Sequence, residues 1–279
     1  MATPQTETPA KTEKNLQKEE KNISNKVLEQ INKFTATGEI QMPPNYSAEN
    51  AIKGAWIVLQ DQQTRDKRPV LEACTNISIA SALFKMCMEG LSALKGQGYF
   101  IPYGTELTWM RDYNGSRALA KRVGNVASVP ANVVFEGDEF EIGVDPKTGY
   151  QFLVKHKPNP DGRDMSKIKG AYAIVNYKDG RQNLEYMTME EIRTAWAQGA
   201  NKGNSPAHQK FPQEMCKKTV IQRACKEPIN SSDDGYLFAT MEEPQEDTED
   251  IAHEVVDEVH EVTGTKAIEF EKETDEPGY

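Results

Sequence analysis

The sequence predicts an α+β fold in which helices pack beside a small antiparallel β-sheet. Apolar residues recur at helical spacing over residues 24–88 and again over residues 211–226. Between these stretches lie short alternating segments separated by strong turn signals such as Glu136-Gly137-Asp138, which are typical of an antiparallel meander. Helices before and after a run of short strands indicate the α+β class.

The N-terminal part is expected to form three helices. The first is predicted to begin at Ser24 and to carry an apolar stripe made of Ile23, Val27, Ile31 and Phe34. This stripe could dock on a neighbouring protomer or pack on its own domain. Ser47 is expected to cap a second helix that ends near Gln63, and a third helix is expected over residues 76–88.

Five strands are expected in the middle of the chain, over residues 131–135, 139–144, 150–155, 168–176 and 182–187. An Asp-Gly turn, Lys178-Asp179-Gly180-Arg181, predicts a hairpin between the last two. Thr188 and Glu191 then form a capping box, which predicts a helix to about residue 198. After a flexible loop, the last core helix is expected over residues 211–226, with Pro212 in its first turn.

Charge divides the 279-residue chain into three predicted parts. Residues 241–279 hold 15 acids and two lysines, a net of −13, so the overall net charge of −10 leaves +3 for residues 1–240. The acidic segment is expected to be flexible and either to bind a protein partner or simply to aid solubility. Residues 1–22 are polar and are expected to be disordered, which leaves residues 23–240 as the folded core.

The sequence favours a cytoplasmic protein without a membrane anchor. No apolar run approaches the roughly 20 residues of a membrane span, and the N-terminus lacks the apolar stretch of a signal peptide. The four cysteines lie far apart, without CxxC spacing, in apolar helical stretches. They are expected to be buried thiols in a reducing compartment.

One segment, residues 90–124, combines aromatic and cationic side chains and is predicted to form a strand, a turn and a helix. Tyr99, Ile101 and Tyr103 would share one face of the strand, and Asp112-Tyr113-Asn114-Gly115 would form the turn. Ser116 or Asn114 could cap the helix, on which Arg117 and Lys121 stand four residues apart. Cations attract phosphates and flat apolar rings stack on unpaired bases, so the pattern suits nucleic acid, although such aromatics also occur in cores and such cations on ordinary solvated faces.

Three blocks of the sequence resemble the RecT family (RecT/Redβ) of phage-type single-strand DNA annealing proteins. They are GLSALKGQGYFIPYG with the following RDYNGSRALAKRVG, the KGAYA block that leads to MTMEEI, and FPQEMCKKTVIQRACK near the end of the core. The resemblance covers residues 23–238 in order and without large gaps.

The resemblance implies a function and an assembly. It implies a homo-oligomeric ring or helical filament that binds single-stranded DNA in a basic groove and anneals complementary strands through a duplex intermediate, without ATP. A companion exonuclease and a host single-strand-binding protein are the implied partners in the bacterial cytoplasm.

On that mechanism, two sets of side chains would contact DNA. The cations expected to neutralise phosphate are Lys95, Arg111, Arg117, Lys121, Arg122, Lys217, Lys218, Arg223 and Lys226. The aromatics expected to contact bases or sugars are Tyr99, Tyr103, Trp109 and Tyr113.

Motifs for other chemistry are missing from the sequence. No Walker A motif, no HExxH pattern and no Gly-x-Ser-x-Gly elbow occurs, so neither ATP-driven strand exchange nor nucleophilic catalysis is expected. We expect a protein that is not an enzyme and has no cofactor, with a role for Mg²⁺ left open. The alternatives are a passive single-strand-binding protein that recruits partners through its acidic tail, and a metal-dependent nuclease.

Overall fold

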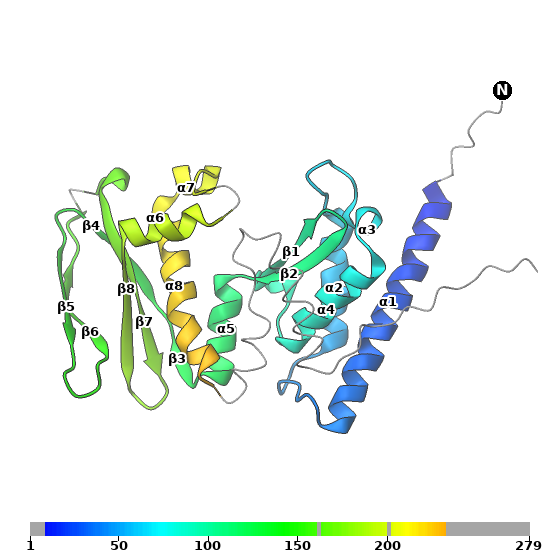
Figure 1. The fold of residues 1–279 in the computed structure, drawn as a ribbon, viewed down its shortest axis with the longest axis horizontal. Coiled ribbons are helices and arrows are strands. Elements are labelled where there is room, and N and C mark those ends of the chain that lie inside the picture. Colours follow the sequence, from blue (N-terminus) through cyan, green and yellow to red (C-terminus); the bar gives the residue numbers. More distant parts are fainter. Residues whose placement is uncertain (1–8, 161–162, 200–201, 233–279) are drawn as a thin grey trace, which may run out of the picture. The chain divides into compact units, whose positions relative to one another are not determined.

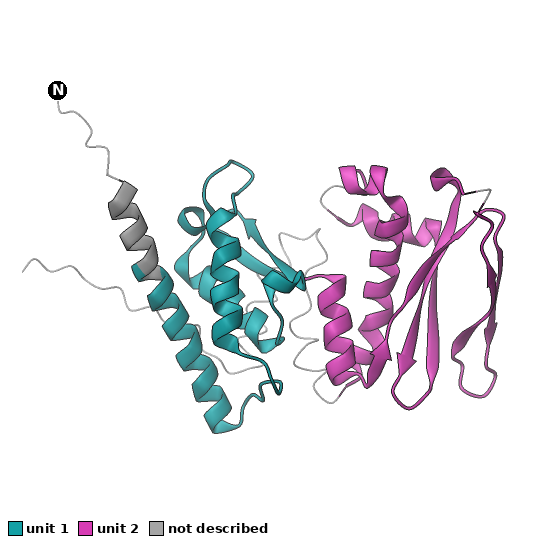
Figure 2. Ribbon diagram, turned by 180° about the vertical axis from the view of Figure 1, so that it is seen from behind, with its two compact units in different colours: residues 1–110, 266–279 teal, residues 111–265 magenta. Residues whose placement is uncertain are grey.

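The computed structural model describes residues 9–160, 163–199 and 202–232 (Figure 1). These residues fall into two compact units that divide between Met110 and Arg111 (Figure 2). The acidic segment predicted over residues 241–279 and the first eight residues lie outside the described part. The helices and antiparallel strands agree with the predicted α+β class, and the predicted core over residues 23–240 extends over both units.

Unit 1 contains four α-helices, a 3-10 helix and a β-hairpin among its described residues. They are α1 (Pro9–Thr37), α2 (Ala48–Asp61), α3 (Val70–Ala73), α4 (Asn76–Met88), η1 (Ala93–Lys95), β1 (Gly98–Tyr103) and β2 (Glu106–Arg111), whose last residue belongs to unit 2. Ser47 and Thr75 accept hydrogen bonds from the first turns of α2 and α4, as N-caps do.

Helix α1 differs from its predicted extent because it begins at Pro9 and not at Ser24. The disorder expected for residues 1–22 therefore does not apply to residues 9–22. The predicted apolar stripe is buried within unit 1: Val27 is fully buried and Phe34 packs edge-on against Phe84, with ring centroids 6.0 Å apart. Trp56 of α2 also donates a hydrogen bond to Ser24 at 2.8 Å. This stripe packs on its own unit.

The hairpin of β1 and β2 was only half predicted. Strand β1 was expected, and Phe100 is buried between the exposed Tyr99 and the half-buried Ile101, as alternation requires. Strand β2 was missed. Its Trp109 is fully buried, with its ring 5.0 Å from that of Phe100 and its indole N–H donated to Glu89 at 2.7 Å.

Unit 2 is a three-layered arrangement around one antiparallel sheet. Its strands are β3 (Val126–Ser128), β4 (Ala131–Phe135), β7 (Ile168–Tyr177) and β8 (Gln182–Thr188), with β5 (Glu139–Val144) and β6 (Gln151–Lys157) as a separate hairpin. Its helices are α5 (Tyr113–Val123), η3 (Met165–Lys167), α6 (Met189–Ala197), α7 (Pro206–Lys210) and α8 (Pro212–Asn230).

Strand β7 is the centre of this sheet. Both β3 and β4 pair with it along one edge, while β8 pairs with it along the other. Helices α5, α6 and α8 cover one face, and the β5–β6 hairpin lies on the opposite face (Figure 1). The predicted strands are all present, but the predicted meander is wrong: β4 leaves β5 to pair with β7, because its apolar side chains are buried beneath α8.

Most local predictions in unit 2 are confirmed. The turn at Gly180 joins β7 to β8, and the Thr188–Glu191 capping box opens α6. Pro212 lies in the first turn of α8, although this helix continues beyond the predicted residue 226. The predicted turn at residues 112–115 is instead the start of α5, with Asp112 at the N-cap.

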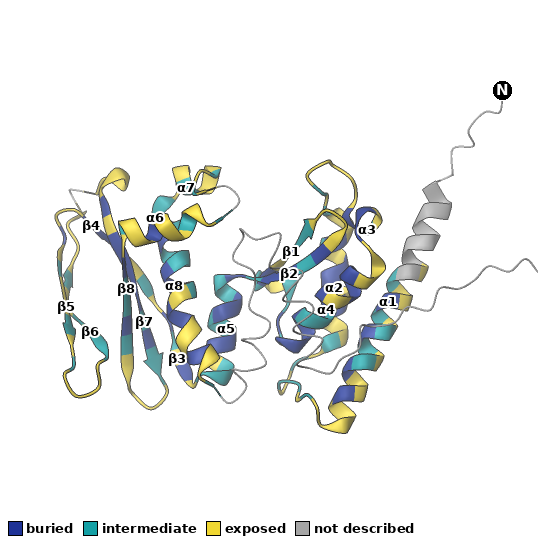
Figure 3. Ribbon diagram, viewed as in Figure 1, coloured by how far each residue is buried: buried dark blue, intermediate teal, exposed yellow. Residues whose placement is uncertain are grey.

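All four cysteines are buried thiols, as predicted. Burial raises the pKa of Cys87, Cys216 and Cys225 to about 12. These thiols belong to the packed interior, and Figure 3 shows that buried residues recur along α4 and α8, the helices that carry these three cysteines.

Helices α5 and α8 approach closely where α5 ends. A Cβ added at Gly124 would lie 2.6 Å from the carbonyl oxygen of Pro228 and 2.7 Å from the Pro228 ring. Neither group can turn away, because one is backbone and the other is a buried ring. A glycine is therefore required at this contact.

We expect Gly124→Ala to lower the free energy of unfolding by about 2–3 kcal/mol through overpacking. Gly143→Ala is the matched control. The three atoms nearest to its new Cβ all belong to the ring of Phe152, an exposed side chain that can move, so a change within about 0.5 kcal/mol is expected. Urea unfolding followed by circular dichroism measures both, and equal losses would contradict the close-contact argument.

Candidate nucleic-acid interface

Helix α5 presents cations that are not neutralised by carboxylates. The guanidinium of Arg117 donates two hydrogen bonds to the carbonyl oxygen of Val129, at 3.1 and 2.8 Å, and lies 5.6 Å from the centre of the Tyr113 ring. Lys121, one turn further on, is exposed, and among the residues described it has no hydrogen-bond or ion-pair partner. A carbonyl or a ring orients a cation without cancelling its charge, so this edge of α5 remains positive.

Two other arginines flank this edge. Arg111 donates to the hydroxyl of Ser116 at 3.3 Å, which holds it beside the first turn of α5. Arg122 is half-buried near the end of the helix. Cations at a helix C-terminus also interact favourably with the helix dipole, so Lys121 and Arg122 are stable at that position.

The cations of helix α8 differ from those of α5, because three of them form ion pairs with carboxylates. Lys217 pairs with Glu214 at 3.0 Å, and Arg223 pairs with Glu185 of β8 at 2.8 Å. Burial raises the pKa of the Glu185 carboxyl, an effect that Arg223 opposes. Lys226 is exposed. The predicted phosphate-binding stripe on α8 is therefore partly engaged within the protein.

The third pair joins α8 to α5. Lys218 lies 3.0 Å from a carboxylate oxygen of Asp112, the N-cap residue of α5, whose side chain is only 2% exposed. A buried carboxylate needs a cation beside it, and removal of one partner leaves an uncompensated charge. Lys218 therefore has a structural role that the sequence did not reveal.

The predicted aromatic contacts divide between the two units. Tyr99 and Tyr103 lie on β1 and are 52% and 42% exposed, with the exposed Lys95 nearby in η1. Tyr113 is half-buried beneath Arg117 in unit 2. Trp109 is 0% exposed in the core of unit 1, and this placement assigns it to packing, because a ring without exposed surface cannot stack on a base.

Sequence reasoning passed over a further cation, Arg163. It is exposed, and its guanidinium lies 5.3 Å from the centre of the Phe135 ring. Its polar loop made it resemble an ordinary solvated residue. The only sequence feature that could have indicated a binding role for Arg163 is its position a few residues before the strand β7. This feature is a weak indication of function.

None of the helices described is long and apolar enough to cross a membrane. Within the same residues, no three His, Cys, Asp or Glu side chains are grouped so that they could hold a metal ion.

Comparisons with known proteins point to one family. Residues 49–257 match the model of the RecT family. The chain is also 31% identical over 198 residues to Protein RecT of Escherichia coli (strain K12), an alignment that covers 66% of this chain and 68% of that protein. The matched range includes α5, the whole sheet of unit 2 and α8.

We expect Lys218→Ala to lower the free energy of unfolding by about 3 kcal/mol, because the buried Asp112 carboxylate loses its cation. Lys217→Ala is the matched control on the same helix; its pair is more exposed and contributes less than about 1 kcal/mol. Adding Asp112→Asn to Lys218→Ala should recover much of the loss. Urea unfolding measures all three variants, and equal stability of the two lysine variants would contradict a structural role for Lys218.

Proposed function

Since this chain belongs to the RecT family, we propose that it binds single-stranded DNA and anneals complementary strands in recombination without ATP. The observation that carries the proposal is on α5, where Arg117 is held by a carbonyl oxygen and Lys121 has no partner among the described residues. These charges are available to phosphates. A phosphate contact releases counterions, which supplies much of the affinity of such proteins for DNA.

Annealing requires little chemistry from the protein. Pairing itself releases about 1.4 kcal/mol per base-pair step, so the energy comes from the DNA. The protein has to reduce repulsion between two phosphate backbones and keep one strand open to its complement. A row of protomers, each with a cationic helix edge, does both, and we therefore include a homo-oligomeric ring or filament in the proposal.

We also propose where this protein acts and which proteins act with it. A phage-type annealing protein acts in the bacterial cytoplasm on single strands that a companion exonuclease exposes and that a host single-strand-binding protein first covers. The exposed Tyr99 and Tyr103 of unit 1 are proposed to contact bases or sugars, and Lys95 a phosphate.

The pairing rate of two labelled complementary oligonucleotides tests the function. The protein is added to one strand without nucleotide triphosphate, and the second strand follows. We expect faster pairing than without protein. Slower pairing would identify a passive single-strand-binding protein, and shortened strands in the presence of Mg²⁺ would identify a nuclease; either result contradicts the proposal.

Lys217→Ala tests the contribution of α8. If Lys217 contacts a phosphate, its removal should weaken binding to all sequences alike and reduce the slope of log affinity against log salt by about 0.7. Lys178→Ala is the control, because Lys178 is exposed in the turn that follows β7 and is not among the proposed contacts. Fluorescence anisotropy of a labelled oligonucleotide at several salt concentrations gives both slopes. An unchanged slope for Lys217→Ala would remove this residue from the interface.

A further inference from the structure

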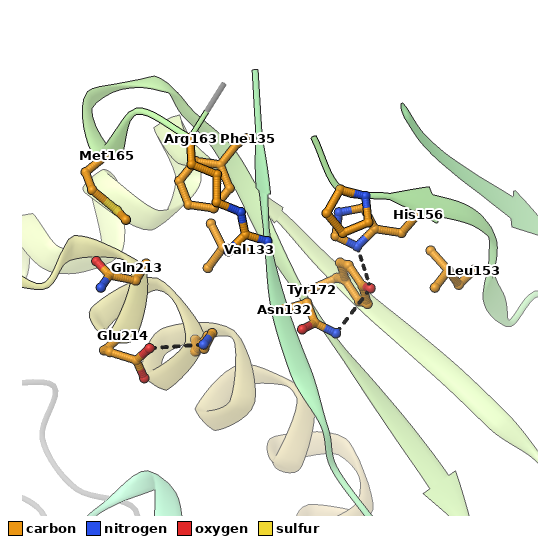
Figure 4. Close-up of a pocket in the computed structure, with 12 residues that line it drawn as sticks. Asn132, Val133, Phe135, Leu153, His156, Arg163, Met165, Tyr172, Gln213 and Glu214 are labelled. Atoms are coloured by element: carbon orange, nitrogen blue, oxygen red, sulfur yellow. Dashed lines mark hydrogen bonds and ion pairs between the residues drawn. The ribbon is translucent and has the colours of Figure 1, made fainter. Parts of the chain in front are cut away.

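Unit 2 contains a cavity of about 490 Å³ that the annealing mechanism does not use (Figure 4). It is lined by side chains from β4, β6, β7, the segment before β7 and the first turns of α8. Its volume falls within the roughly 300–1,000 Å³ of ligand pockets. Lys217, a proposed phosphate contact, is part of its lining, so the cavity adjoins the proposed path of the DNA.

The cavity combines an apolar wall with a positively charged rim. Phe135 and Val133 form part of the wall, and Arg163 lies over the Phe135 ring. Lys217 and Glu214 cancel one another as an ion pair, so Arg163 leaves a positive charge in excess. Guanidinium planes stack on bases and bind phosphates, and an anionic ligand with a flat apolar part therefore fits this rim.

A chain of hydrogen bonds fixes the orientation of Asn132 in the lining. Asp138 is buried and accepts hydrogen bonds from the backbone N–H groups of Phe135 and Asn159, at 2.9 and 2.7 Å. Its carboxylate faces Nε2 of His156 at 3.3 Å, and Nδ1 of His156 lies 2.9 Å from the hydroxyl of Tyr172.

The direction of this chain follows from the carboxylate, which only accepts. His156 donates from Nε2 to Asp138 and accepts at Nδ1 from the Tyr172 hydroxyl, whose oxygen accepts from Nδ2 of Asn132 at 3.3 Å. The Asn132 amide therefore has its nitrogen turned to Tyr172 and its oxygen turned away, as Figure 4 shows. An amide held in this way can offer an acceptor and its second N–H to a ligand.

A second amide in the lining, that of Gln213, has an oxygen that accepts no hydrogen bond from the described residues. This oxygen, Oε1, is buried. A buried acceptor without a donor destabilises a protein by about 1–3 kcal/mol. A ligand with an N–H group would satisfy it.

We propose that this cavity takes one nucleotide of a bound single strand, with the edge of its base on the amide of Gln213 beside Phe135 and its phosphate at Arg163. The base edges of DNA carry adjacent donors and acceptors, which side-chain amides match. The inference rests on the proposed binding of single-stranded DNA and adds to it a pocket that receives a base.

The experiment compares two strands of equal length, one with a mixed base sequence and one made of abasic sites. Both carry the same phosphates, so the ratio of their dissociation constants measures what the bases contribute. The ratio is measured by fluorescence anisotropy for the full chain and for Gln213→Leu and Arg163→Ala. Arg181→Ala is the matched control: Arg181 is also exposed over an aromatic ring, that of Tyr177 at 4.8 Å, but it does not line the cavity.

We expect the wild-type chain to bind the mixed strand at least fivefold more tightly than the abasic strand. Gln213→Leu and Arg163→Ala should each reduce this ratio by threefold or more, whereas Arg181→Ala should leave it unchanged. The same ratio in all four proteins, with both strands still bound, would overturn the pocket and leave the proposed function in place. Failure of the wild-type chain to bind either strand would overturn the proposed function as well. Arg163 is an exposed loop residue, so its variant is informative even if Gln213→Leu does not fold.

Discussion

The contact between α5 and α8 fixes where the cations of unit 2 lie. Two features maintain it: the glycine at position 124, which lets the end of α5 meet Pro228, and the ion pair between Asp112 and Lys218 at the start of α5. Both helices then cover the same face of the sheet and share one apolar core with it. Arg117 and Lys121 are held on a rigid element for this reason, and a rigid element presents charges at fixed spacing to a repeating phosphate backbone.

The cations of the two helices are used for different purposes. Three cations of α8 (Lys217, Lys218 and Arg223) face carboxylates of the protein, whereas Arg117 of α5 is held by a carbonyl group and keeps its charge uncancelled. Exposed pairs such as Lys217–Glu214 are weak and can exchange a carboxylate for a phosphate at little cost. The Lys218–Asp112 pair cannot, because its carboxylate is buried. Burial of the acid, and not the presence of the lysine, therefore separates a structural cation from one that is available to DNA.

The sequence predicted best what depends on a few neighbouring residues. The capping box at Thr188, the Asp-Gly hairpin and the start of α8 at Pro212 are local signals, and all three are present. Helix α1 was predicted to start too late, because its first turns lack the apolar stripe on which the prediction relied.

Features that depend on contacts between distant residues could not be predicted from local sequence signals. Residues 90–124 read as one strand–turn–helix unit, yet the chain divides between Met110 and Arg111, and the turn residues serve as the first turn of α5. Trp109 was chosen as an aromatic that could meet a base, but its partner Glu89 lies 20 residues earlier in the sequence, so its burial could not be seen. The cavity of unit 2 is likewise assembled from residues 132 to 217. Only folding brings them together.

A pocket that holds a base is compatible with annealing if the free energy of its contacts to the base is similar to the free energy of pairing that base. Contacts to one stacked base contribute about 1–3 kcal/mol, and one base-pair step contributes about 1.4 kcal/mol. A complementary strand that has already paired with the neighbouring bases can therefore draw the held base out of the pocket, whereas a strand with a mismatch at that point gains too little to do so. One pocket in each protomer leaves the other bases accessible. Under these magnitudes the pocket sets the register of the first strand without preventing its pairing with the second.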